Sequence, residues 1–238
     1  MRFKYLVYLL VFSLLSQTCE DEKTIEFKEI NVTTSTNKIV EINIPEAFGD
    51  VQISEAINRT INQHIIYSLS LKDDGKIASN TIKESIDFFN KEHENFQLEF
   101  PETAAIWEAQ IDGEVMYQSE DIISIAITSY LNTGGAHGSL NISFLNFNTQ
   151  TGQALRNKEL FQDYEAFSNV SKVAFNKEIA NKKEMYFEPE NFILPANIGF
   201  NDEGVILLYN TYEIAPYSSG ITEINIPWED LQSALNFL

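Results

Sequence analysis

The sequence predicts an α+β fold with antiparallel sheets and packed helices, arranged as a small N-terminal strand-helix part followed by a larger C-terminal α+β domain. Three observations support this. Apolar and polar residues alternate in several segments of strand length, apolar residues recur at intervals of four in others, and turn residues such as Asp-Gly separate the strands. With 44% hydrophobic residues, the 238-residue chain can bury a substantial core.

The N-terminal part is predicted over residues 25–100. A strand pair is expected between Thr24 and Ile44, where Ile, Phe and Val alternate with polar neighbours, and Pro45 is expected to close it. A first helix is predicted from Val51 to Leu71, because apolar residues four apart form one stripe. A second helix is predicted from Thr81 to Glu94.

The C-terminal domain is predicted over residues 101–238. Its first strands, 104–116 and 122–131, are expected to turn at Asp112-Gly113 and around 119–121. The elements expected after them are a strand at 139–147, a helix at 163–183, strands at 197–200, 204–209 and 221–226, and a terminal helix from Pro227 that carries Leu231, Leu235 and Leu238. Together these elements indicate one α+β domain.

The N-terminus has the layout of an export signal. Two cations precede an apolar run and small polar residues, which predicts a signal peptide over residues 1–18. The segment that ends at Cys19 resembles a lipobox, so this cysteine is the expected lipid attachment site, followed by an acidic tether at 19–24. Because Thr18 is larger than the residues usual before the cysteine, an ordinary secreted protein is the alternative. The expected location is the cell envelope, at the outer membrane, on its periplasmic or surface face.

The charge of the chain restricts its partners. Lys and Arg total 16 against 35 Asp and Glu, a formal net charge of −19. Such a surface repels nucleic-acid phosphates and anionic lipid headgroups. Nucleic acid is therefore an unfavourable partner, membrane contact is expected through the lipid anchor only, and a cationic partner is favoured. The alternative is that the acidity only keeps an exported protein soluble.

The glycine-rich stretch NTGGAHG is the first candidate site. It begins at Asn132 and lies between two predicted strands. Its glycines permit backbone angles and close approaches that other residues forbid, and its histidine can carry a proton. The alternative is a structural turn. The candidate ligand-binding residues in this stretch are Asn132, Gly134, Gly135, His137 and Gly138.

The tyrosine-rich stretch from Tyr209 to Gly220 is the second candidate site. Tyr212, Glu213 and Tyr217 are the candidate ligand-binding residues, because aromatic faces stack on sugars and a carboxylate holds hydroxyl groups. The alternative is that these tyrosines only cover the edge of the core.

No motif predicts a cofactor or a metal. The three histidines are far apart in the sequence, and neither a phosphate-binding loop nor a Gly-x-Ser-x-Gly elbow occurs. No complete catalytic set is visible, so no catalytic residue is assigned.

Several longer motifs resemble a known family. These motifs are YLNTGGAHGSLNISFLNFNTQTGQAL from Tyr130, KELF at 158–161, ENFILPANIGFNDEGVILLYNTYEIAPYSSG from Glu190, and INIPWEDL at 224–231. They resemble the bacterial exported domain family of unknown function that occurs in the ectodomain of the anti-sigma factor RsiV and in the non-catalytic region of the peptidoglycan deacetylase PdaC. The resemblance covers about residues 100–238 and implies an extracytoplasmic α+β module. It extends neither to the catalytic domain of the deacetylase nor to the transmembrane and cytoplasmic segments of the anti-sigma factor.

The first functional hypothesis is a non-enzymatic cell-envelope lipoprotein that binds cell-wall glycan, meaning peptidoglycan, or a cationic protein such as lysozyme. Lysozyme is a candidate only because of the resemblance, since the RsiV ectodomain binds lysozyme. The alternative is an envelope hydrolase or deacetylase-like enzyme that uses His137 or Glu213 as its base. A purely structural envelope component is a third possibility.

Overall fold

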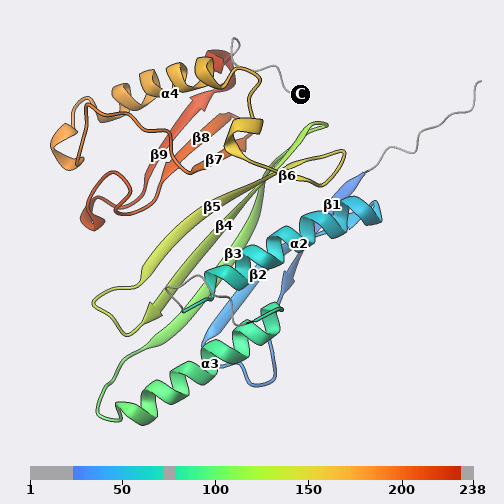
Figure 1. Ribbon diagram of the computed structural model, residues 1–238, viewed down its shortest axis with the longest axis vertical. Helices are drawn as coiled ribbons and strands as arrows, with labels where there is room; N and C mark the ends of the chain where they lie inside the picture. The colour runs from blue at the N-terminus through green and yellow to red at the C-terminus, as the bar shows by residue number, and fades with distance from the viewer. Residues whose placement is uncertain (1–23, 72–78, 232–238) are drawn as a thin grey trace, which may run out of the picture.

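The computed structural model describes residues 24–71 and 79–231. Cys19, the signal peptide at 1–18 and nearly all of the tether at 19–24 lie outside these residues. The described chain forms two sheets and three α-helices, which confirms the α+β fold (Figure 1).

The larger sheet has six strands in sequence order. They are β1 (Ile25–Asn31), β2 (Val40–Gly49), β3 (Trp107–Gln118), β4 (Ile122–Thr133), β5 (Ser139–Asn148) and β6 (Ala154–Leu155). All neighbours are antiparallel except β2 and β3, which run parallel. A parallel pair needs a crossover connection, and here that connection contains α2 (Val51–Ser68) and α3 (Ile82–Glu99).

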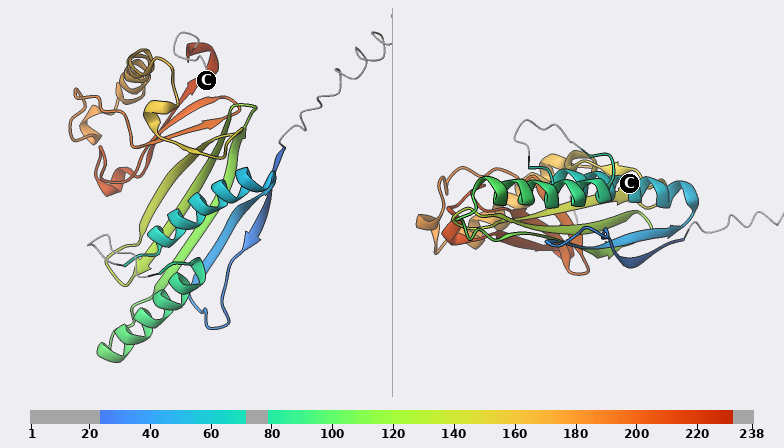
Figure 2. Two further views of the ribbon diagram at one scale, coloured as in Figure 1. Left: turned by 45° about the vertical axis from the view of Figure 1, so that its right-hand side comes forward. Right: turned by 90° about the horizontal axis from the view of Figure 1, so that it is seen from below.

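Both of these helices cover one face of the larger sheet (Figure 2). The side chain of Asp50 caps α2 by accepting hydrogen bonds from the amides of Gln52 and Ile53, and Thr81 caps α3 through the amide of Glu84. The expected apolar stripe of the first helix is completely buried, as are its partners on the sheet. Together with α3 they form one core cluster, whose buried side chains include Ile57, Ile61, Ile65, Ile86, Phe89, Ile42, Ile111 and Ile125.

The smaller sheet has three antiparallel strands, β7 (Asn197–Asn201), β8 (Gly204–Tyr209) and β9 (Thr222–Pro227). Helix α4 (Tyr164–Ile179) packs against it and begins at Asp163, whose carboxylate accepts a hydrogen bond from the Ala166 amide. Four short 3-10 helices complete the described chain: Asn157–Glu159, Lys183–Met185, Tyr217–Ser219 and Trp228–Leu231.

Strand β7 joins the two sheets. It contacts β4 and β5 on the face of the larger sheet opposite the helices, where Ser124 and Asn146 are paired neighbours. The Phe200 amide donates to Ser124 Oγ at 3.1 Å, and Asn146 Nδ2 donates to the Ile198 carbonyl at 2.7 Å. A Cβ at Gly199 would lie 2.2 Å from the ring of Phe144, so glycine is required for this approach.

The outer edge of β5 is occupied by a side-chain amide. Asn210 Oδ1 accepts from the Ile142 amide at 2.8 Å, and Asn210 Nδ2 donates to the Ile142 carbonyl at 2.9 Å. The side chain of Asn210 thus takes the place of a neighbouring strand at this residue. Because Asn210 directly follows β8, these bonds also place the tyrosine-rich stretch beside β5.

The predicted turn at Asp112-Gly113 and the predicted strand end at Pro45 both lie inside strands. Asp112 and Gly113 lie in the middle of β3, which pairs with β4 on both sides of them. A Cβ at Gly113 would lie 2.6 Å from Pro45 Cδ, so this glycine permits close packing rather than a turn. Pro45 lies within β2 beyond the Asn43–Asp112 pair that ends the β2–β3 ladder, so its missing N–H costs no bond to β3.

The helix predicted from Pro227 is confirmed in its first turn, with a start one residue later. Pro227 ends β9, and a 3-10 helix follows directly from Trp228 to Leu231, the last described residue. Leu231 is completely buried in the second core, as expected of that residue. Leu235 and Leu238 lie outside the described residues.

Sheet pairing crosses the boundary predicted between residues 100 and 101, because β2 pairs directly with β3. The buried apolar side chains form two clusters. The first extends from Ile25 to Phe147, and the second comprises Ile122 together with residues from 160 to 231. Among the described residues, no helix is both long and apolar enough to cross a bilayer.

Candidate functional site

The two candidate stretches lie side by side, where the β4–β5 turn meets the segment between β8 and β9. The rings of His137 and Tyr217 are stacked, with centroids 3.9 Å apart and planes inclined by 19°. The Tyr217 hydroxyl donates to the Gly138 carbonyl at 3.3 Å, and the Tyr212 ring centroid lies 5.9 Å from that of Tyr217. The structure therefore brings together the histidine and the tyrosines that the sequence singled out.

The β4–β5 turn is held in shape by its polar and glycine residues. The amide of Gly134 donates to Asn132 Oδ1 at 3.0 Å, and Gly134 has a φ of 83°, which favours glycine. A Cβ at Gly138 would lie 2.4 Å from the ring of Tyr130, so Gly138 is packed directly on that ring. Gly135 has no comparable contact, since its nearest neighbour is the His137 carbonyl oxygen at 3.7 Å.

The tyrosine-rich stretch contains an unusual backbone conformation. Among the described residues, Tyr212 is the one non-glycine residue with a positive φ, 68°. Its amide donates to the Ala215 carbonyl at 3.1 Å, which closes the turn. Such a conformation costs about 1–3 kcal/mol and is enriched at active and ligand-binding sites. Here it leaves the Tyr212 side chain 59% exposed beside Tyr217, which is 36% exposed.

Glu213 accepts hydrogen bonds from two backbone amides, one in its own segment and one just before β7. Its carboxylate accepts from the Asn210 amide at 2.9 Å and from the Ala196 amide at 3.4 Å. Burial, together with the nearby charge of Glu213, raises the pKa of Tyr209, whose hydroxyl donates to the Ile193 carbonyl at 2.7 Å. Glu213 therefore stabilises the turn, and its hydrogen bonds link it to backbone amides rather than to the imidazole of His137.

Two aromatic residues next to the site were missed in the sequence. The Tyr130 ring supports Gly138, and Trp107 pairs with Thr133 across β3 and β4. Among the described residues, Trp107 Nε1 is buried without a hydrogen-bond partner, 3.6 Å from where a Gly134 Cβ would lie. Both lie within segments that the sequence predicts only as strands, 104–116 and 122–131. Only the strand register, which is not local in sequence, places them beside the turn.

No three histidine, cysteine, aspartate or glutamate side chains within residues 24–71 and 79–231 are grouped so that they could hold a metal ion. The chemistry that the described site offers is an exposed aromatic surface, edged by carbonyl, amide and hydroxyl groups. Such a surface can stack against a flat apolar face of a ligand and hydrogen-bond to its rim.

Two family models divide most of the chain between them. Residues 31–140 match the family described as "Deacetylase PdaC", and residues 146–229 match DUF3298, a "Protein of unknown function". The chain resembles the PdaC and DUF3298 families. The border between the two matches lies within β5.

Solved structures show the same fold. A DUF3298 family member from Bacteroides fragilis NCTC 9343 is 20% identical, has a TM-score of 0.65, and the match covers 90% of this chain and 93% of that one. A DUF3298 family protein from Pseudomonas aeruginosa PAO1 is also 20% identical, with a TM-score of 0.58 and coverage of 90% and 95%. None of the curated proteins matches the chain. These two structures show that the chain shares its fold with DUF3298 family proteins.

Proposed function

We propose that the chain is a non-enzymatic, lipid-anchored binding module of the cell envelope, which binds cell-wall glycan at the His137–Tyr217 stack. The observation that carries this proposal is the stack itself, with its ring centroids 3.9 Å apart. The anchor part of the proposal rests on the signal-like N-terminus and Cys19.

The stack suits a sugar because it is both fixed and accessible. The hydrogen bond from Tyr217 to the Gly138 carbonyl and the contact of Gly138 with Tyr130 fix the position of the ring. Tyr217 nevertheless stays 36% exposed and Tyr212 59% exposed. The apolar C–H face of a pyranose can pack on such rings, while its hydroxyl groups bond to the polar rim.

Tyr217→Ala is expected to weaken binding of an N-acetylglucosamine tetramer about tenfold, because loss of one stacked ring removes about 1–1.5 kcal/mol. Tyr217→Phe keeps the ring but loses the hydrogen bond to the Gly138 carbonyl, so it is expected to weaken binding less than Tyr217→Ala does. Isothermal titration calorimetry on all variants measures the effect, and pull-down with purified peptidoglycan provides a second readout.

Tyr67→Ala is the matched control, since Tyr67 is 62% exposed on α2, away from the site. It is expected to leave the affinity unchanged. If Tyr217→Ala and His137→Ala both fold, by circular dichroism, and bind the tetramer as wild type does, the proposed site is wrong.

A cationic protein such as lysozyme is a second candidate ligand. The observation that favours it is the row of exposed acidic residues on the helix-free face of the larger sheet, including Glu41, Asp112 and Glu114, in a chain of net charge −19. Lysozyme binding that weakens with salt and is unaffected by Tyr217→Ala would favour this candidate over the glycan.

A further inference from the structure

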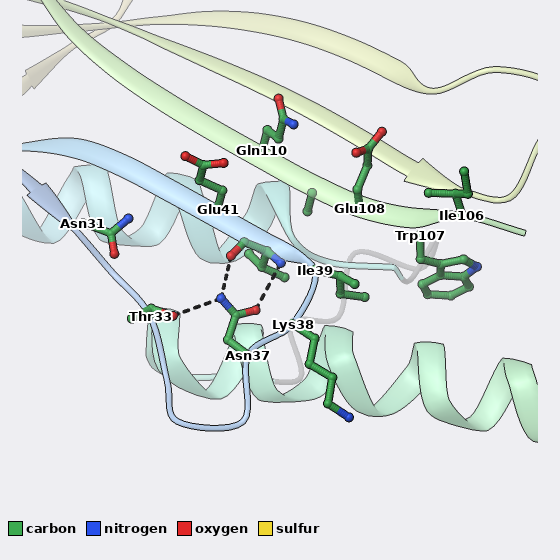
Figure 3. A pocket seen from close by; sticks show the side chains of 12 residues that line it. Asn31, Thr33, Asn37, Lys38, Ile39, Glu41, Ile106, Trp107, Glu108 and Gln110 are labelled. Atoms are coloured by element: carbon green, nitrogen blue, oxygen red, sulfur yellow. Dashed lines mark hydrogen bonds between the residues drawn. The ribbon is translucent and has the colours of Figure 1, made fainter.

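A pocket lies on the same sheet, where β2 and β3 begin. It has a volume of about 530 Å³ and opens between the β1–β2 loop, residues 32–39, and the first residues of β3 (Figure 3). Its lining comprises Asn31, Thr33, Asn37, Lys38, Ile39, Val40, Glu41, Ile106, Trp107, Glu108, Ala109 and Gln110. It exists because β2 pairs with β3 only from Val40 onward, so the earlier part of β3 has no β2 residue beside it.

The loop that forms one wall is held by polar contacts. The side-chain amide of Asn37 donates to the Val40 carbonyl at 2.6 Å and to Thr33 Oγ1 at 3.0 Å, and Asn37 Oδ1 accepts from the Val40 amide (Figure 3). Asp87 on α3 accepts from the hydroxyls of Thr34 and Thr36. Hydrogen bonds from Thr36 and then Thr34 lower the pKa of Asp87, so it stays ionised and keeps the loop in place. The pocket is therefore preformed.

The pocket presents uncompensated negative charge. Glu41, Glu108 and Gln110 extend to the same side of the sheet (Figure 3). The one lysine in the lining, Lys38, has its Nζ 2.9 Å from Glu94 Oε1, so its charge is already paired. Within the described residues, neither Glu41 nor Glu108 forms an ion pair. Ile106, two residues before Glu108, is 70% exposed and supplies an apolar surface in the lining. Two carboxylates together with this apolar surface match an ammonium group carried on a carbon skeleton.

The pocket and the aromatic stack are ends of one surface. Glu41 pairs with Gln110, Gln110 with Tyr130, and Tyr130 with Leu140, so these four residues form a row across four strands on one face. Tyr130 in turn supports Gly138, whose carbonyl accepts from Tyr217. Three strand spacings amount to about 14 Å. A short oligosaccharide can extend over that distance.

We infer that this pocket binds the ammonium group of an amino sugar, at Glu41 and Glu108, in a glycan that also contacts the His137–Tyr217 stack. The inference rests on the proposed function, because the aromatic stack supplies the other contact. It adds the chemical class of the ligand: a glycan with free amino groups binds more tightly than its fully N-acetylated counterpart.

The test compares two probes, an N-acetylglucosamine tetramer and a glucosamine tetramer, by calorimetry at low salt and at a pH where the amines are protonated. Wild-type protein is expected to bind the glucosamine tetramer about tenfold more tightly, and added salt is expected to reduce this preference. The double variant Glu41→Gln/Glu108→Gln is expected to bind both tetramers equally.

The matched control is Glu223→Gln/Glu229→Gln, which removes the same charge from exposed residues of the other sheet region. It is expected to keep the preference. Equal binding of both tetramers by wild type, or a preference that survives Glu41→Gln/Glu108→Gln, overturns this inference while leaving the glycan proposal in place. If the wild type binds neither tetramer, both proposals fall. Circular dichroism confirms that each variant is folded.

Discussion

Replacement of Phe200 with alanine is expected to lower the free energy of unfolding by about 3–5 kcal/mol. Phe200 is completely buried in β7, with its ring 6.0 Å from those of Phe161 and Trp228 and 6.4 Å from that of Tyr117. Its partners come from both sheet regions, because Tyr117 belongs to β3. The truncation therefore leaves a cavity where the two cores meet. Urea denaturation followed by circular dichroism measures the loss.

Phe187→Ala is the control for this truncation, because Phe187 is the same residue type at 57% exposure. It is expected to change the free energy of unfolding by less than about 0.5 kcal/mol. Hydrogen exchange locates the effect: Phe200→Ala is expected to reduce protection in β4 as well as in β8, since the Phe200 amide bonds to Ser124 on β4. A loss below about 1 kcal/mol, or a loss confined to β8, would contradict this account of the junction.

The helices were predictable because their signals are local. Ile57, Ile61 and Ile65 are four residues apart, and this spacing alone places them on one buried face. The parallel pairing of β2 with β3 was not predictable, because its partners, such as Val40 and Ala109, are far apart in sequence. The same pairing explains why a turn was wrongly predicted at Gly113. This glycine leaves room for the Pro45 ring on the neighbouring strand and does not form a turn.

The residues of the candidate site were identified from sequence, but their relation to one another was not. Glycines and tyrosines indicated two unusual segments, each of which had a purely structural alternative. Their contact depends on the docking of β7 on β4 and β5 and on the bonds between Asn210 and Ile142. The pocket at Glu41 and Glu108 was not predictable from the sequence, because isolated carboxylates on a strand normally indicate only a solvent-exposed face.

The second large effect is expected at Asn146, which holds β7 to β5. Asn146 is 3% exposed, and its Nδ2 donates to the Ile198 carbonyl at 2.7 Å. Asn146→Asp keeps the shape but places a carboxylate against a carbonyl oxygen, with no donor. An uncompensated buried charge costs about 3–5 kcal/mol, so the variant is expected to lose stability by that amount at neutral pH.

This loss is expected to depend on pH, with a definite sign. Burial raises the pKa of the new carboxyl in the folded state above its unfolded value of about 3.9. The destabilisation is therefore fully present above the folded-state pKa and diminishes as the pH falls toward 3.9, where the protonated carboxyl can itself donate to the Ile198 carbonyl. Thermal melts of Asn146→Asp and wild type between neutral and mildly acidic pH measure the difference.

Asn176→Asp makes the same chemical change at an exposed position of α4. It is expected to stay within about 0.5 kcal/mol of wild type at every pH. Subtraction of its pH profile removes the general effect of one added negative charge on a chain of net charge −19. A deficit in Asn146→Asp that is constant across pH would indicate that shape, rather than the donor from Asn146 to Ile198, joins the two sheets. A loss of stability that becomes smaller as the pH falls would show that the buried hydrogen bond from Asn146 to Ile198 holds β7 on the larger sheet. The proximity of the two candidate loops would then depend on this bond.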